Sequence, residues 1–154
     1  MALLLVVNLH GKINSTRATR RALGEMKVEK KFTASVLTDD GPTVGMLKSC
    51  KEFVAWGPVE KETLATLLEK KGMISEKKHL GTDALAELGA KSYEELASRM
   101  LDQSLRLSAL KNVRPFFRLS PPRGGFKKSL RRQASDGGVL GKNPELAEIV
   151  RRMV

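Results

Sequence analysis

The first 57 residues alternate between strand-like and helix-like patterns, and this alternation constrains the fold more than any other feature. A continuous branched apolar run is typical of a buried strand, strict alternation of a strand with one exposed face, and spacing of three or four of a helix. By these criteria the sequence predicts strands at 3–9, 32–37 and 53–56 and helices at 17–27 and 42–50. The order β-α-β-α-β, with both helices on one face of a small sheet, predicts a ferredoxin-like α+β core.

Several boundaries within this core have their own signals. Asn14 or Ser15 is expected to cap the first helix. In the second strand the alternation places Thr33 and Ser35 on the solvent side. The pair 57–58, Gly-Pro, is expected to end the third strand.

Beyond Gly57 the sequence becomes leucine-rich and balanced in charge, which indicates a helical extension over 58–112. Gly72 is expected to end a helix, and Ser92 with Glu95 forms a capping box at the start of another. Asn143 is expected to cap a closing helix.

Residues 103–135 carry nine lysines and arginines and no acid, and we call them the acid-free segment. Within it, 113–120 predicts a strand at a sheet edge, where Pro115 is tolerated. A Pro-Pro-Arg-Gly-Gly turn follows, and 127–138 has too few apolar residues to pack, which predicts an extended arm ordered by a partner. The expected organisation is a core at 1–57, a helical extension at 58–112, and a basic strand and arm with a final helix at 113–154.

The net charge of +11 is concentrated in the acid-free segment and favours a polyanionic partner. Gly124 and Gly125 would allow backbone N–H groups to approach a phosphate closely. A membrane surface is less suitable, because the proline and glycine content forbids a long amphipathic helix. A disordered basic linker without a specific partner is the simpler alternative, and nucleic acid is the preferred interpretation.

The residues needed for catalysis or metal binding are sparse. Cys50, His10 and His79 are too few for a four-ligand zinc site, and Cys50 lies on the apolar side of its helix. The paired carboxylates 39–40 and 94–95 stand at helix starts, where acids stabilise the helix dipole. The sequence therefore predicts no enzyme, no metal, no cofactor and no small-molecule substrate.

The core sequence has partial features of two other functions. The first strand is similar to the RNP2 strand of an RNA-recognition motif, but Leu5 occupies the aromatic position on which that module stacks bases. An acylphosphatase-like phosphate cradle at 10–17 would use Arg17, yet no second catalytic group accompanies it. The single cysteine and the absence of a signal-peptide pattern or a membrane-spanning run predict a cytosolic protein.

Four separated blocks of the sequence resemble one known family, the archaeal and eukaryal form of ribosomal protein thirty of the large subunit. The blocks are "GPTVGMLKSCKEFVAWG" at 41–57, "KETLATLLEKKG" at 61–72, "FFRLSPPRGGFKKS" at 116–129 and "GGVLGKNPELAEIV" at 137–150. They span most of the chain in the family's order. One departure is His10, where many relatives carry an arginine.

The resemblance implies a cytoplasmic structural constituent of the large ribosomal subunit, bound to its ribosomal RNA and to neighbouring ribosomal proteins. A transient assembly factor or RNA regulator with the same basic surface is the alternative. The RNA-facing residues implied by the resemblance are Arg17, Arg20, Arg21, Lys48, Lys51, Arg118, Arg123, Lys127, Lys128, Arg131 and Arg132. To these the chemistry of the acid-free segment adds Arg114, Gly124 and Gly125.

Overall fold

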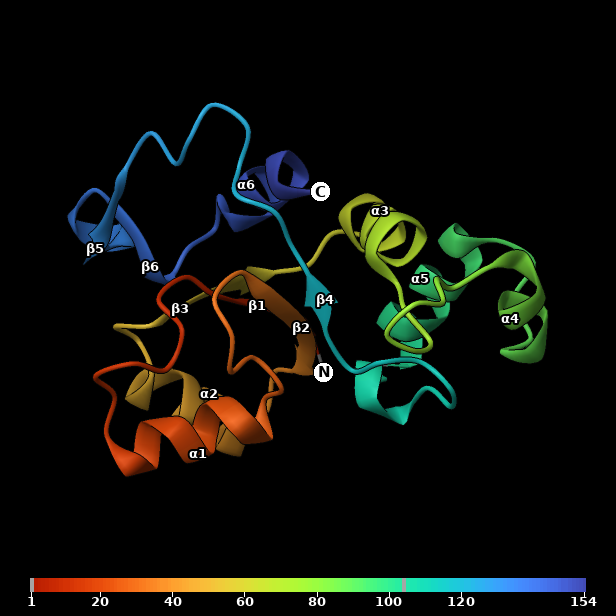
Figure 1. The fold of residues 1–154 in the computed structure, drawn as a ribbon, viewed down its shortest axis with the longest axis horizontal. Coiled ribbons are helices and arrows are strands. Elements are labelled where there is room, and N and C mark those ends of the chain that lie inside the picture. The colour runs from red at the N-terminus through yellow and green to blue at the C-terminus, as the bar shows by residue number, and fades with distance from the viewer. Residues whose placement is uncertain (1, 104) are drawn as a thin grey trace.

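The computed structural model describes residues 2–103 and 105–154, which form a mixed six-stranded sheet and six α-helices of an α+β protein (Figure 1). The strand order across the sheet is β4-β2-β1-β3-β6-β5. The strands are β1 Leu3–Asn8, β2 Thr33–Thr38, β3 Val54–Pro58, β4 Phe117–Arg118, β5 Ser129–Gln133 and β6 Gly138–Lys142. The helices are α1 Arg17–Glu25, α2 Gly41–Ser49, α3 Lys61–Lys71, α4 Thr82–Glu87, α5 Tyr93–Gln103 and α6 Leu146–Met153.

The centre of the sheet comes from the first 58 residues, in the predicted order β1-α1-β2-α2-β3. β1 pairs antiparallel with β2 on one side and with β3 on the other. Both α1 and α2 lie on one face of this sheet, as the alternation predicted (Figure 1). On that face Val6 packs with Leu23 of α1 and Leu47 of α2.

The opposite face of the sheet is covered by the later part of the chain. Leu5 and Val7 of β1 belong to a larger core with Leu64 of α3, Leu96 of α5 and Val150 of α6. Both faces of β1 are therefore buried, which leaves no open sheet surface there for base stacking.

The predicted exposure of β2 is wrong. Thr33 and Ser35 are buried, although the alternation suggested a solvent-facing side. They lie on the α1 side of the sheet, and the Ser35 hydroxyl donates a hydrogen bond of 3.0 Å to the carbonyl oxygen of Pro115. The segment at Pro115 covers Ser35, and the pairing of β4 with β2 places Arg118 beside Thr33.

Several predicted boundaries also differ in detail. The cap of α1 is Thr16, whose hydroxyl accepts a hydrogen bond of 3.2 Å from the N–H of Thr19. β3 ends at Pro58, the second residue of the predicted Gly-Pro pair, with Gly57 inside the strand. Asn143 caps the turn before α6, since its Oδ1 accepts the N–H of Glu145 at 2.9 Å. Ser92 caps α5 as expected, through the N–H of Glu95 at 3.2 Å.

The segment expected to be an unpaired arm contains a strand. Ser129–Gln133 forms β5, which pairs parallel with β6, and β6 pairs parallel with β3. Most β5 side chains are exposed, so the strand is held by its backbone and by its neighbour β6 rather than by a core of its own. The edge strand predicted at 113–120 is present in part, as β4 paired with β2.

Candidate nucleic-acid interface

The cations of α1 lie on its exposed face. Thr16 fixes the start of the helix, and its apolar side is held by Ala22 and Leu23, so Arg17, Arg20 and Arg21 point away from the core. Arg21 forms an ion pair of 3.0 Å with Glu25, one helical turn away. Arg17 has no acidic partner among the described residues, and a phosphate could approach it without displacing a carboxylate.

The Pro-Pro-Arg-Gly-Gly turn is fixed to the end of α6. The N–H of Arg123 donates to the carbonyl oxygen of Arg152 at 3.0 Å, and Arg152 Nη1 donates to the carbonyl oxygen of Gly125 at 2.7 Å. Gly124 and Gly125 both have positive φ, 76° and 74°, and nothing lies within 4 Å of the position that a Cβ would take. The Arg123 side chain and the glycine backbone are therefore presented outward on a turn whose position is set.

Long-range hydrogen bonds bring β5 next to two turns of the N-terminal half. His10 Nε2–H donates to the carbonyl oxygen of Leu130 at 2.7 Å, and Gln133 Nε2 donates to that of Lys51 at 3.0 Å. Arg131 and Arg132 consequently share a surface hollow with His10 and Lys51. The acids Glu52 and Asp136 also line this hollow.

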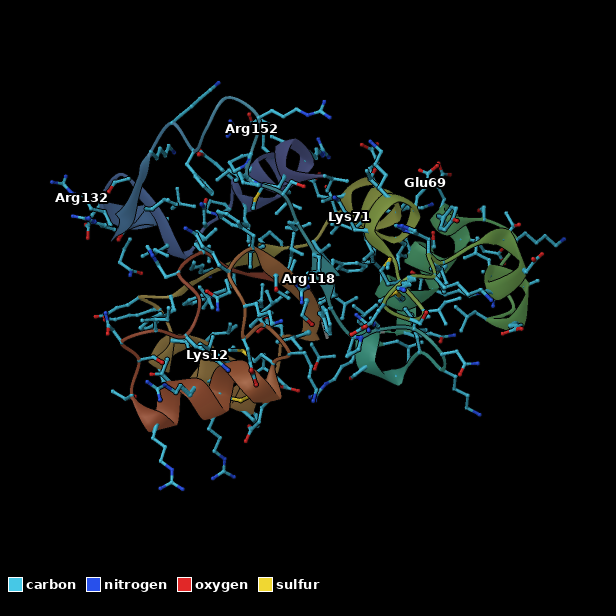
Figure 2. All side chains as sticks on the ribbon, in the orientation of Figure 1. Lys12, Glu69, Lys71, Arg118, Arg132 and Arg152 are labelled. Atoms are coloured by element: carbon cyan, nitrogen blue, oxygen red, sulfur yellow. The ribbon has the colours of Figure 1, made fainter. Side chains whose placement is uncertain are left out.

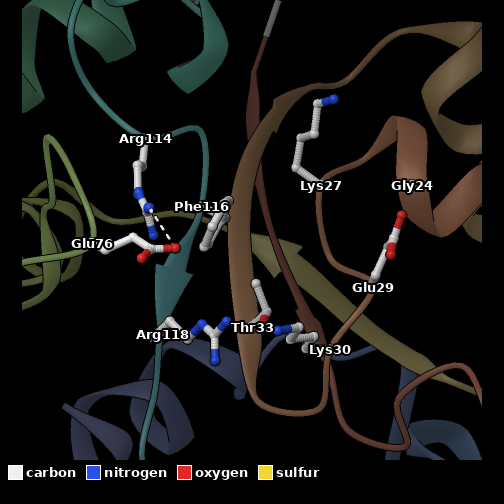
Figure 3. Close-up of a pocket in the computed structure, with 9 residues that line it drawn as sticks. All are labelled: Gly24, Lys27, Glu29, Lys30, Thr33, Glu76, Arg114, Phe116 and Arg118. Atoms are coloured by element: carbon white, nitrogen blue, oxygen red, sulfur yellow. Dashed lines mark ion pairs between the residues drawn. The ribbon is translucent and has the colours of Figure 1, made fainter.

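A second hollow, of about 420 Å³, lies between β4 and the connection that precedes β2, and it contains two of the predicted residues, Arg114 and Arg118 (Figure 3). Lys27 and Lys30, from the connection between α1 and β2, line the same hollow. Sequence reasoning did not select these two lysines. Their signal was the lysine-rich stretch at 27–31, which leads into β2 and so lies beside β4, the strand that pairs with β2.

The remaining predicted cations are exposed, and their pairing differs. Lys48 occupies the last turn of α2, and Lys127 has positive φ, 58°, before β5. Lys128 forms an ion pair with Glu145. Such exposed pairs contribute little free energy, so a polyanion could compete for these cations.

The structure thus brings the predicted residues together in groups rather than in one patch. Figure 2 shows Arg132 and Arg118 on separate parts of the molecule, and neither belongs to the helices α4 and α5. In Figure 1 those two helices lie at the opposite end from β5 and α1. The residues at 58–102, which carry more acids than bases, include both helices, so charge is segregated along the molecule.

The perturbed ionisable groups have structural explanations. Burial raises the pKa of the Cys50 thiol, which makes it a poor nucleophile. Hydrogen bonds from Thr43, followed by those from Thr38, hold the pKa of Asp40 below its usual range at the cap of α2. The N–H of Lys91 and the nearby Arg99 lower the pKa of Glu95. Among the described residues no cluster of histidines, cysteines and acids could hold a metal ion.

The fold and its surface define a small basic α+β protein whose main chemical feature is exposed cations presented on turns and sheet edges. In the described part of the chain, no helix is both long and apolar enough to cross a membrane. None of the protein-family models that were compared matches the sequence.

Individual relatives match the chain over its length. It is 37% identical over 150 residues to the large ribosomal subunit protein uL30 of Nitrosopumilus maritimus, covering 97% of each chain. It is 36% identical over 156 residues to the protein of the same name from Thermofilum pendens, and 35% identical over 160 residues to that from Aeropyrum pernix, covering 100% of both chains in each case. The chain belongs to the uL30 family.

Proposed function

We propose that this protein is a non-enzymatic structural constituent of the large ribosomal subunit in the cytoplasm, where it binds ribosomal RNA. The observation that carries the proposal is the match to archaeal uL30 proteins along the entire chain. The surface supports it, because exposed cations of α1, of the turn at 121–125 and of β5 are available to phosphates.

The mode of binding follows from the kind of surface. Folded ribosomal RNA presents phosphates at many angles, and proteins recognise it largely by neutralising charge and fitting its shape. A set of separate basic groups suits such a target better than one flat patch. We assign RNA contact to the predicted cations Arg17, Arg20, Arg21, Lys48, Lys51, Arg114, Arg118, Arg123, Lys127, Lys128, Arg131 and Arg132, and to the backbone at Gly124 and Gly125.

Each part of the chain has a role in this proposal. Residues 1–57 act as a ferredoxin-like RNA-binding core, and 58–112 as a helical extension that faces solvent or neighbouring ribosomal proteins. Residues 113–154 carry the basic strand and turn, which enter between RNA helices. The lack of acids in 103–135 is what such burial requires, because a carboxylate facing phosphates would be an unpaired like charge.

Binding of the purified protein to large-subunit ribosomal RNA over a range of salt concentrations tests the proposal. Each phosphate contact releases counterions, so the logarithm of the affinity should fall linearly with the logarithm of salt concentration, by roughly 0.7 to 0.9 per contact. A steep slope is expected. An affinity that does not respond to salt would contradict phosphate-dominated binding.

A further inference from the structure

The hollow beside β4 is lined by an aromatic ring and a threonine as well as by cations, and phosphate binding alone would require only the cations. It lies where the cover provided by α1 ends, between the 27–30 connection and the edge strand, and Phe116 lines it together with Arg114 and Arg118 (Figure 3). The Phe116 side chain is half-buried, so part of its ring is exposed. The same three residues also line an adjoining hollow beside Met73 and His79, so the groove continues across β4.

The floor of this groove holds a polar atom without a partner. Thr33 lines the hollow and is 3% exposed, and its Oγ1 is buried with no hydrogen-bond partner in the described structure. Thr33 is the register partner of Arg118, and Figure 3 shows it between Arg118 and Lys30. A buried hydroxyl without a partner costs free energy in the unbound protein, so a ligand group that bonds to it recovers that cost.

The groove also offers a stacking surface with cations around it. The guanidinium carbon of Arg114 lies 5.7 Å from the centre of the Phe116 ring, and Arg114 Nη2 is 3.7 Å from Glu76. Lys30 and Arg118, by contrast, have no ion-pair partner among the described residues. Aromatic rings and arginine planes are the surfaces on which unpaired bases stack, and nearby cations bind the adjoining phosphate.

We infer that this groove binds one unpaired nucleotide of ribosomal RNA. Its base stacks at Phe116 and Arg114, its edge hydrogen-bonds to the Thr33 hydroxyl, and its phosphate lies at Arg118 and Lys30. The volume of about 420 Å³ is in the range of small-ligand sites. This inference rests on the proposed function and adds a specific contact to it.

An acidic peptide from a neighbouring protein is the competing occupant, and the groove suits it less. Glu29 and Glu76 line the same space, where they would repel a run of carboxylates. A nucleotide can place one of its two phosphates on the cationic side and exocyclic amino groups near the two acids. A peptide carboxylate would also leave the exposed part of the Phe116 ring unused.

Thr33→Val and Phe116→Leu, measured against purified large-subunit ribosomal RNA, test the inference. Each variant should lose about tenfold in affinity, because one stacking or base-edge contact is removed. The salt dependence should match that of the original protein, because no phosphate contact changes. Thr66→Val, in α3 outside the groove, is the matched control, and it should bind normally.

The free protein gives a second readout for Thr33→Val. Removing an unpartnered buried hydroxyl should leave the unfolding midpoint unchanged or raise it, so a loss of affinity cannot be attributed to a damaged fold. If the original protein and both variants bind the RNA equally, the groove inference is wrong while the proposed function stands. If the original protein does not bind the RNA, both are overturned.

Cross-linking identifies the occupant directly. Phe116→p-benzoylphenylalanine, assembled into large subunits and irradiated, should form an adduct with ribosomal RNA. Adducts only with a neighbouring protein would overturn the inference in favour of a peptide.

Discussion

Arg106 and Asp40 are joined by a hydrogen bond of 2.6 Å from Nη2 to Oδ2, although 66 positions separate them in the chain. Arg106 Nε also donates to the Thr38 hydroxyl at 3.0 Å. Asp40 is at the same time the N-cap of α2, accepting the N–H of Thr43 at 2.9 Å. One carboxylate thus ties the segment after α5 to the end of β2 and the start of α2.

We predict that Asp40→Asn lowers the free energy of unfolding at neutral pH. An asparagine still caps a helix, but it loses the charge that Arg106 and the helix dipole stabilise. Urea unfolding followed by circular dichroism measures the effect. Asp39→Asn is the matched control, because Asp39 is exposed and is not the cap. Equal stability of the two variants would contradict the role given to Asp40.

The same carboxylate predicts a pH dependence. Because the folded state lowers the pKa of Asp40, its contribution is fully present above the unfolded value of about 3.9 and is lost as pH falls toward the folded value. The unfolding free energy of the original protein should therefore decline on acidification more steeply than that of Asp40→Asn. Parallel curves would show that Asp40 is not stabilised in the folded state.

Gly57 is predicted to be intolerant of any side chain. A Cβ there would overlap the carbonyl oxygen of Asn143 and touch Leu146, where the chain leaves β6 beside β3. We expect Gly57→Ala to cost about 1–3 kcal/mol in unfolding free energy, as overpacking generally does. Gly45→Ala, in open space within α2, should instead stabilise by about 0.5–1 kcal/mol. A tolerated alanine at Gly57 would contradict the close approach of β6.

Charge reversal tests the basic turn and strand. Glutamates at Arg123, Lys127 and Arg131 should weaken binding to ribosomal RNA strongly and flatten the salt slope by roughly 0.7 to 0.9 per lost contact. All three side chains are exposed, so the unfolding midpoint should change little. Loss of folding would show these residues to be structural instead.

The matched control variant changes the net charge by the same amount as that triple variant. It reverses Lys61, Lys70 and Lys91, which are exposed in the helical extension. Normal RNA binding by the control is expected. An equal loss in both variants would mean that binding senses only net charge and not the position of the cations.

Arg152→Lys tests whether the guanidinium group of Arg152 holds the turn at 121–125 in place. Lysine keeps the charge but cannot reproduce the guanidinium contact with Gly125. We expect a loss of about 1 kcal/mol in unfolding free energy and faster tryptic cleavage after Arg123. Arg151→Lys, whose side chain contacts Glu60 instead, should leave that cleavage unchanged. Unchanged cleavage in Arg152→Lys would show that the turn is held by other contacts.

The local patterns predicted the elements whose signal lies within one segment. The apolar run of β1, the helical spacing of α1, the glycine after α3 and the capping box of α5 all correspond to elements in the structure. What sequence reasoning missed depends on distant partners. β6 is rich in glycine and lacks a strand signal, and β5 is polar. β6 forms because its backbone pairs with β3 and β5, and β5 forms because its backbone pairs with β6.

The same limit applied to the candidate interface. Composition identified the cations of 103–135, and the structure places them on exposed turns and edges. The positions of Lys27, Lys30 and Thr33 beside Arg118 could not be inferred, because these residues come together only through the pairing of β2 with β4. His10 contacts β5 through a backbone oxygen 120 residues away.

Sedimentation of a gently prepared native lysate on a sucrose gradient, after washes of increasing salt, tests the central claim most directly. We predict that the protein migrates with the large subunit at about one copy per subunit and remains there after a high-salt wash, because many phosphate contacts must be broken together. Migration at the top of the gradient, or release at modest salt, would contradict a structural role and indicate a transient visitor to the ribosome.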